Sequence, residues 1–434
     1  MKYTKAGSKE GPERDDGVSG RTLALRATFL FINFFLIITG YYQVKPASRS
    51  LFIEYLGADY LPYVWIGTAI VLGSAIALYH RWVARYPRDS VVFATCLASI
   101  AALVVFRLLL IAPGPGVAVA FYIFVDIVSV VLVEQFWSLS NSLYGNHTGR
   151  RWYGLVGTGG LVGGVAGGAI ATSLIRFTPL ETPDLLLVAA LIFSVILGLT
   201  RAMRKLGIYR EGATPERPQD ADVQAGTGRF GRRYLILIAS ILFLAQLAEP
   251  VVEFQFLKSV EVVYTEREAR TAFLSLFFSV LGLVSIGINL VLTPVIHRLL
   301  GVIAGMLVQP VALACSSVAF IGHPSLLVAS VMKISDRGLS YSINRASKEL
   351  LYVPIGAVTI YRAKAWIDML GYRVFKVVGS VFILLSTQWL PWAATVEQLG
   401  WLTVAICVVW GLIVMHLRRR YRHLAATGGV LAGA

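Results

Sequence analysis

Charged residues are scarce in this chain. Of its 434 residues, 15% are Asp, Glu, Lys or Arg, whereas 56% are hydrophobic and the mean hydropathy is +0.70. A soluble domain needs a polar surface, so this composition excludes an ordinary soluble protein. It indicates a protein that lies in a lipid bilayer.

Groups that perform chemistry are also sparse. The cysteines Cys96, Cys315 and Cys407 each stand alone in an apolar stretch, and the six histidines are scattered, so neither has the spacing of a disulfide or metal site. No hydrolytic motif is present. The longest stretch between apolar segments, about 205–233, is too short for a nucleotide-hydrolysing domain. We therefore expect no enzyme, no ATP-driven pump, no cofactor and no metal.

The first twenty residues, "MKYTKAGSKEGPERDDGVSG", mix acids with bases, and no cleavage pattern follows them. Signal peptides and transit peptides have a different composition. We expect neither in this sequence.

Long apolar segments dominate the rest of the chain. A membrane-spanning helix requires about 20 mostly apolar residues. The sequence predicts an all-α integral membrane protein with twelve such helices. They lie at 23–44, 60–80, 90–112, 117–144, 152–176, 184–204, 234–257, 272–295, 300–321, 324–347, 364–387 and 395–417.

Basic residues gather in every second loop between these segments, and the linker at 201–233 alone holds eight Lys or Arg. Short cytoplasmic loops collect positive charge, so both termini are expected in the cytoplasm. The net charge of +15 is then mainly a topology signal, and we expect no nucleic-acid partner.

The linker divides the predicted helices into two halves, and corresponding helices of the halves contain similar short sequences: "YHRW" and "IHRL", "YYQVK" and "FQFLK", and "WSLSN" and "YSINR". Similar sequences at corresponding helices suggest a duplicated six-helix unit, as in major-facilitator-type transporters. The expected divisions are a cytoplasmic tail at 1–22, six-helix halves at 23–204 and 234–417, a cytoplasmic linker at 205–233 and a cytoplasmic tail at 418–434.

Ionisable residues inside spanning helices are costly in lipid and usually face a cavity or a partner. Two open interpretations apply to them: a binding site for an anionic solute, or ion pairs that only support the fold. Lys258 could also be a simple interfacial anchor. The residues concerned are Lys45, Asp126, Glu134, Glu249, Glu253, Lys258, Lys333, Asp336 and Arg337. Pro250, between the two glutamates, is expected to break its helix.

Glycine is concentrated at 154–168, "GLVGTGGLVGGVAGG". No Lys follows as in a phosphate-binding loop, and the stretch lies in an apolar helix. Glycines recur every four residues in two series, 159/163/167 and 160/164/168, a pattern typical of close helix packing.

Four segments resemble one known family. The most specific, at 337–380, has Lys348-Glu349, "YVP" at 352–354, Lys364, Asp368 and Lys376 before Gly379. The others are "FWSLSNSLYGNHTGRRWYGLVGTGG" at 136–160, "PVVEFQFLK" at 250–258 and "YYQVKPASRSLF" at 41–52. Together they resemble the nucleotide transporter family, which includes the ATP/ADP translocases of plastids and of obligate intracellular bacteria.

This resemblance implies twelve helices in a major-facilitator-like arrangement and exchange of nucleoside tri- and diphosphates. It also implies functional charges in helices 1, 4, 7 and 10, which correspond to Lys45 or Arg49, Asp126, Glu253 and Lys348.

We therefore expect a secondary transporter of an anionic, phosphorylated solute such as ATP or ADP. It would act as a monomer in a bacterial inner membrane. The expected binding residues are Lys45, Arg49, Asp126, Glu253, Lys258, Lys333, Arg337 and Lys348, and an inner gate would contain Glu349, Lys364 and Asp368. Two alternatives stay open: proton-coupled transport of another solute or a lipid through Glu134 or Asp126, and a non-transporting membrane scaffold.

Overall fold

The computed structural model describes residues 20–86, 88–143, 146–207, 229–352, 372–390 and 393–426, which are almost entirely helical. The first half of the chain comprises α1 (Gly20–Leu56), α2 (Leu61–Arg85), α3 (Arg88–Leu109), α4 (Pro115–Leu143), α5 (Asn146–Phe177) and α6 (Leu185–Lys205), with short 3-10 turns η1 (Ala58–Tyr60) and η2 (Thr182–Asp184).

The second half comprises α7 (Arg229–Val263), α8 (Arg267–Gly287), α9 (Thr293–Leu299), α10 (Val302–Gly322), α11 (Leu326–Leu339), α12 (Arg345–Tyr352), α14 (Tyr372–Leu384) and α15 (Leu399–Ala426). Three π-helical turns interrupt or extend these helices: η4 (Ile288–Leu292) joins α8 to α9, η5 (Ser340–Asn344) joins α11 to α12, and η7 (Leu385–Trp389) follows α14.

Ten of the described helices are long and apolar enough to cross a membrane, and α8, η4 and α9 together form one of them. Two predicted spans fall outside this set. The segment from α11 to α12 carries Lys333, Asp336 and Arg337, and the apolar helix at Val374–Trp389 is shorter. The helical, membrane-spanning character is confirmed, and the number twelve stays a prediction.

Two prolines lie inside continuous helices, at places where the sequence predicts an end or a break. We predicted that the first helix ends at residue 44 and that Pro250 breaks the seventh. Both expectations are wrong, because α1 continues through Pro46 to Leu56 and α7 continues through Pro250 to Val263. Proline is tolerated in membrane-spanning helices when neighbouring groups accommodate the lost backbone hydrogen bond. Residues 45–56 are therefore helical and largely buried.

The glycines of α5 allow the closest helix packing in the first half. A Cβ atom added at Gly159 or Gly163 would lie 2.5 Å from the carbonyl oxygen of Phe31 or Phe35 on α1. At Gly168 it would lie 2.5 Å from the carbonyl oxygen of Ser275 on α8. These separations are too short for any side chain, so the packing predicted from the glycine spacing is confirmed. One helix thus contacts its own half and the opposite half.

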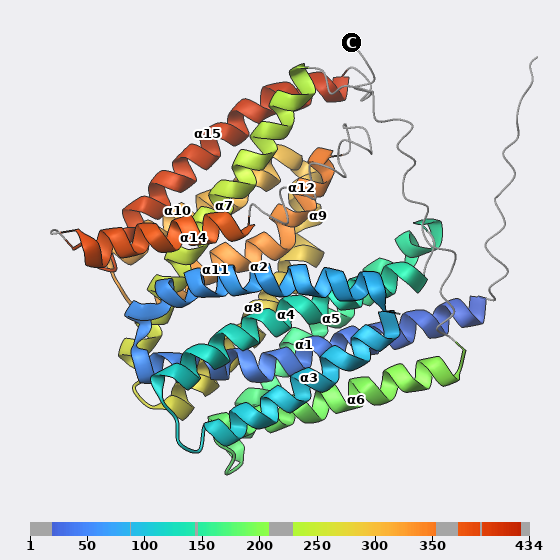
Figure 1. Ribbon diagram of the computed structural model, residues 1–434. Coiled ribbons are helices and arrows are strands. Elements are labelled where there is room, and N and C mark those ends of the chain that lie inside the picture. Colours follow the sequence, from blue (N-terminus) through green and yellow to red (C-terminus); the bar gives the residue numbers. More distant parts are fainter. Residues whose placement is uncertain are drawn as a thin grey trace, which may run out of the picture.

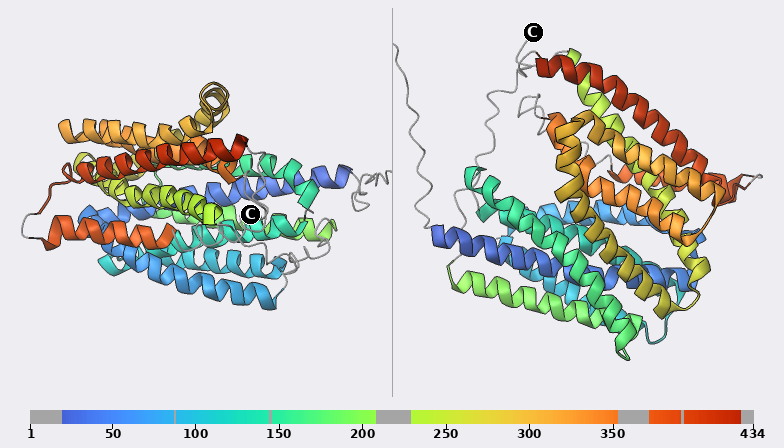
Figure 2. Two further views of the ribbon diagram at one scale, coloured as in Figure 1. Left: turned by 90° about the horizontal axis from the view of Figure 1, so that it is seen from above. Right: turned by 180° about the vertical axis from the view of Figure 1, so that it is seen from behind.

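The two halves form a wedge. Figure 1 shows them meeting near the end where α7 passes into α8 and diverging toward the end where the C-terminus lies, and the view from behind in Figure 2 agrees. Across the junction α5 packs on α8, α1 on α8 and α2 on α14. A hydrophobic cluster that includes Phe52 and Trp65 from the first half and Phe256 and Phe277 from the second also joins the halves.

Candidate functional site

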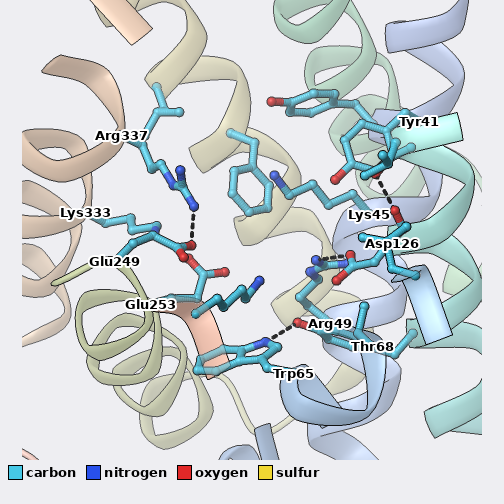
Figure 3. A pocket seen from close by; sticks show the side chains of 18 of the residues that line it. Tyr41, Lys45, Arg49, Trp65, Thr68, Asp126, Glu249, Glu253, Lys333 and Arg337 are labelled. Atoms are coloured by element: carbon cyan, nitrogen blue, oxygen red, sulfur yellow. Dashed lines mark hydrogen bonds and ion pairs between the residues drawn. The ribbon is translucent and has the colours of Figure 1, made fainter. Parts of the chain in front are cut away.

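A cavity lies between the two halves, and side chains from both of them line it (Figure 3). The lining residues are Tyr41, Tyr42, Lys45 and Arg49 of α1; Trp65, Thr68, Ala69 and Leu72 of α2; Tyr122, Asp126, Ser129 and Val130 of α4; Glu249 and Glu253 of α7; Phe278 and Leu281 of α8; Lys333 and Arg337 of α11; Tyr341 of η5; and Lys376 of α14.

On the wall formed by the first half, an arginine is held by an acid and a ring. Arg49 Nη2 lies 2.6 Å from Asp126 Oδ1, and the guanidinium lies 4.3 Å from the centroid of Tyr122. The Tyr122 hydroxyl accepts a hydrogen bond of 2.8 Å from Trp65 Nε1. Because Arg49 is only 6% exposed, this charge-assisted contact fixes its position.

The same wall carries a lysine in aromatic surroundings. Lys45 Nζ lies 4.3 Å from the ring centroid of Phe278, 5.3 Å from that of Tyr42 and 5.5 Å from that of Tyr41. Among the residues that the structure describes, no carboxylate lies within 4 Å of this ammonium. Cation–π contacts stabilise it in place of an ion pair. Lys45 therefore brings a positive charge to the cavity that the described acids do not neutralise by direct contact.

The wall formed by the second half contains a network of three acids and two bases. Lys333 Nζ lies 2.5 Å from Glu253 and 3.4 Å from Asp336, and Arg337 pairs with Glu249 and lies 3.7 Å from Asp336. Lys333 is 2% exposed and Asp336 is 3% exposed. Buried charges require partners, and this network supplies them. Both interpretations of these residues are therefore still compatible with the geometry: ion pairing occurs, and it occurs beside a cavity.

A further lysine reaches the cavity from α14. Lys376 Nζ lies 5.5 Å from the ring of Trp65, which belongs to the opposite half. In the sequence, Lys376 belongs to the family-like segment at 337–380 and is not among the predicted binding residues.

Six of the eight predicted binding residues line the cavity, and the other two do not. Those that line it are Lys45, Arg49, Asp126, Glu253, Lys333 and Arg337. Lys348 lies in α12, beyond the π-helical turn that follows Arg337.

Lys258 lies at the closed end of the wedge. Its Nζ is 2.8 Å from Asp59 of η1 and 2.8 Å from Glu261, and Glu261 accepts a hydrogen bond of 2.9 Å from the backbone N–H of Ala58. Lys45 and Lys258 end similar short sequences, "YYQVK" and "FQFLK". The structure places Lys45 eleven residues before the end of α1 but Lys258 only five before the end of α7. Because an α-helix rises about 1.5 Å per residue along its axis, Lys258 lies closer to the end of its helix than Lys45 does and therefore away from the cavity.

A second group at this end centres on Arg267. It lies 2.8 Å from Glu268, 3.4 Å from Glu181 and 3.7 Å from Glu54 of α1. Glu268 in turn accepts hydrogen bonds from the backbone N–H and hydroxyl of Thr182 at 2.8 and 2.7 Å. We call these contacts the closed-end seal. Its residues are Glu54, Asp59, Glu181, Thr182, Lys258, Glu261, Arg267 and Glu268.

The two proton-coupling candidates and the gate candidates differ in position. Glu134 is exposed on α4 and does not line the cavity, whereas Asp126 is held by Arg49. Glu349 is exposed on α12. Lys364 and Asp368 lie outside the described residues, so their assignment to a gate stays a prediction.

Several lining residues were not singled out as site residues in the sequence. Trp65, Thr68, Tyr122 and Phe278 complete the cavity. Their residue types are common in membrane-spanning helices, and no spacing marks them. One signal in the sequence could have indicated them: a position on the same helix face as a charged residue. Tyr122, for example, lies four residues before Asp126.

The fold is that of major facilitator transporters. It is similar to a mutant of the nucleoside transporter NupG, with a TM-score of 0.63 and 13% identity, covering 90% of this chain and 99% of that one. It is also similar to the POT family transporter PepTSo, with a TM-score of 0.65 and 10% identity, covering 92% and 98%. A bacterial homologue of the iron transporter ferroportin in its inward-facing state gives a TM-score of 0.63 and 16% identity, covering 91% and 99%. The protein thus shares the fold of these transporters, with a cavity between its two halves.

Sequence comparison finds similar proteins. The model of the TLC ATP/ADP transporter family matches residues 324–421. ADP,ATP carrier protein 2 of Chlamydia pneumoniae is 20% identical, covering 92% of this chain and 89% of the relative. ADP,ATP carrier protein 1 of the same organism is 22% identical, covering 60% and 59%. The chain is therefore similar to ATP/ADP transporters, through the family model over residues 324–421 and through the first of these relatives over most of its length.

Proposed function

We propose that this protein exchanges phosphorylated nucleotides, such as ATP and ADP, across a bacterial inner membrane by alternating access. The names of its relatives support the choice of nucleotides. The observation that carries the proposal is a cavity between the halves in which Lys45 lacks a carboxylate partner among the described residues. A cation in a partly closed cavity attracts anions strongly, because low-dielectric walls focus its field.

In this proposal the closed-end seal faces outward and the wide end of the wedge faces the cytoplasm. Positive charge in alternate loops supports this orientation. It places the tails at 1–22 and 418–434 and the linker at 205–233 in the cytoplasm. The halves at 23–204 and 234–417 would rock against each other, so that the seal opens as the cytoplasmic end closes.

The proposed contacts follow from the lining residues. Phosphate oxygens would meet Lys45 and Arg49 on one wall and Lys333 and Arg337 on the other. Asp126 and Glu253 would hold the bases when the cavity is empty. Aromatic side chains such as Tyr41 and Tyr341 could stack on a nucleobase.

Lys258 is reassigned to the seal, because its two ion pairs lie there. Lys348 and Glu349 are assigned to the cytoplasmic gate, together with Lys364 and Asp368. We propose a monomer whose partners are its solute and the surrounding lipid, without nucleic acid.

The experiment uses purified protein in proteoliposomes. Uptake of labelled ATP and ADP is measured with and without nucleotide inside. We expect uptake that depends on internal nucleotide and not on a pH gradient. Dependence on the pH gradient would instead support the proton-coupled alternative, and no uptake of either nucleotide would contradict the proposed function.

Sidedness is tested with single cysteines in a background without Cys96, Cys315 and Cys407. A cysteine at Thr178, in the exposed turn after α5, should react with an impermeant reagent added outside cells, whereas one at Lys205, at the exposed end of α6, should react only after permeabilisation. Labelling of both from the same side would contradict the proposed orientation.

A further inference from the structure

A layer of buried hydrogen bonds lies beneath the closed-end seal. Ser50 stands four residues before Glu54 on α1, and Arg270 stands three residues after Arg267 on α8, so both lie about one helical turn deeper than the seal. Ser50 is 0% exposed and Arg270 is 4% exposed. The exposed ion pairs of the seal therefore cover a second set of contacts between the halves.

Arg270 donates hydrogen bonds to carbonyl oxygens of both halves. Its Nε and Nη2 donate at 3.0 and 2.9 Å to the carbonyls of Tyr264 and Thr265, in the turn between α7 and α8 of its own half. Its Nη1 donates at 3.1 Å to the carbonyl of Ser50 in the first half. The Ser50 hydroxyl in turn donates at 3.0 Å to the carbonyl of Arg267. These bonds join α1 to the start of α8 in both directions.

Carbonyl dipoles, rather than a counter-ion, surround the Arg270 guanidinium. Among the residues that the structure describes, no carboxylate lies within 4 Å of it. Carbonyls after a helix C-terminus are natural acceptors for a cation, and here the turn after α7 supplies two of them. Because a hydrogen bond from a charged donor is strong and burial removes competing water, the contact with Ser50 should hold the halves together more firmly than the exposed ion pairs do.

The same arrangement allows the contact to break. If the halves separate at this end, Arg270 loses one acceptor, Ser50, and keeps the two acceptors of its own half. The Ser50 carbonyl is uncharged, so separation leaves no buried carboxylate without a partner, which rupture of a buried ion pair would do.

We propose that Arg270 and Ser50 form a buried latch that keeps the closed end shut while the wide end is open. The exposed ion pairs of the seal separate first, and the end opens when Arg270 releases Ser50. This inference rests on the orientation and the alternating access of the proposed function. It assigns the main resistance to opening to a residue that belongs neither to the cavity nor to the seal.

The test measures how fast an impermeant thiol reagent, added outside cells, reaches the cavity. The reporter is Thr68→Cys in the full-length protein without its native cysteines. With no further change the reaction should be slow. Arg270→Gln should accelerate it by roughly 10- to 150-fold, the equivalent of one hydrogen bond to a charged group. Arg270→Lys should accelerate it as well, because a single ammonium keeps the charge but cannot bridge the three carbonyls.

Arg107→Gln is the matched control. Arg107 is an arginine near the same end of the molecule, 2.8 Å from Asp184, and both residues belong to the first half. Its substitution breaks no ion pair between the halves, so access to the reporter should stay slow.

A disulfide separates opening from unfolding. The γ oxygens of Thr182 in the first half and Thr271 in the second lie 2.8 Å apart, so Thr182→Cys and Thr271→Cys are within reach of a disulfide. Once this bridge has formed, labelling of the Arg270→Gln protein should return to the slow rate, and reduction should restore the fast one.

Three results would overturn the latch: slow labelling of Arg270→Gln, slow labelling of Arg270→Lys, or fast labelling that persists after the disulfide has formed. Equal acceleration by Arg107→Gln would overturn it too. The measurement needs no nucleotide. Nucleotide exchange together with unchanged access in the Arg270 variants would therefore overturn the latch alone, whereas fast labelling of Arg270→Gln in a protein that exchanges no nucleotide would overturn only the proposed function.

Discussion

Ion pairs in the closed-end seal join the two halves of the molecule, whereas ion pairs around the cavity lie within one half. In the closed-end seal, Lys258 joins Asp59, and Arg267 joins Glu54 and Glu181, across the boundary between the halves. Around the cavity, Arg49 pairs with Asp126 within the first half. Lys333 and Arg337 pair with acids of the second half.

The two sets also differ in exposure. The Lys258–Asp59 pair is 24% and 56% exposed, whereas Lys333 and its partner Glu253 are 2% and 12% exposed. Solvent-exposed pairs contribute little, and buried charges are costly to leave unpaired. In the proposed transport cycle, the pairs that would break are thus the weak ones. The pairs that would travel with their own half are the strong ones.

The largest expected effect is at the buried network. Lys333→Met leaves Glu253 without its closest base and should lower stability by about 3–5 kcal/mol. The double variant Lys333→Met with Glu253→Gln should recover most of that loss. Thermal unfolding in detergent measures both. If the single variant were as stable as the wild type, the contrast between buried and exposed pairs would not hold.

Glycine packing gives the next effect. Gly163→Ala places a methyl group 2.5 Å from the carbonyl oxygen of Phe35, so α5 must move away from α1. We expect a cost of about 1–3 kcal/mol, as for other overpacked sites. Gly164→Ala is the matched control, because its methyl group would lie 3.6 Å from Tyr42 at ordinary contact distance. Equal unfolding temperatures for the two variants would contradict the close packing.

The smallest change in stability is expected at the seal. Lys258→Met, the same substitution as at Lys333, should cost about 0–1 kcal/mol. Its effect should appear in access to the cavity. A cysteine at Thr68, in a background without the native cysteines, should react faster with an impermeant reagent added outside when Lys258→Met and Arg267→Gln weaken the seal. Unchanged reactivity would show that these pairs do not hold that end closed.

Much of this protein follows from its sequence alone. Long apolar segments determine that the chain crosses a membrane, because only helices satisfy the backbone there. The spacing of glycines at 159, 163 and 167 determines which face of α5 meets a neighbour, because a helix repeats every 3.6 residues. Charges such as Arg337 and Glu249, rare in lipid, identify the helices beside a cavity.

The tertiary structure decided which of these residues meet. Lys45 and Lys258 follow similar short sequences, yet Lys45 lies in the cavity and Lys258 in the seal, because α1 extends through Pro46 to Leu56. Phe278 beside Lys45 and Trp65 beside Lys376 come from helices far away in the chain, and no local pattern encodes their approach. Helix positions depend on short-range periodicity, whereas a site between two halves depends on how the halves pack.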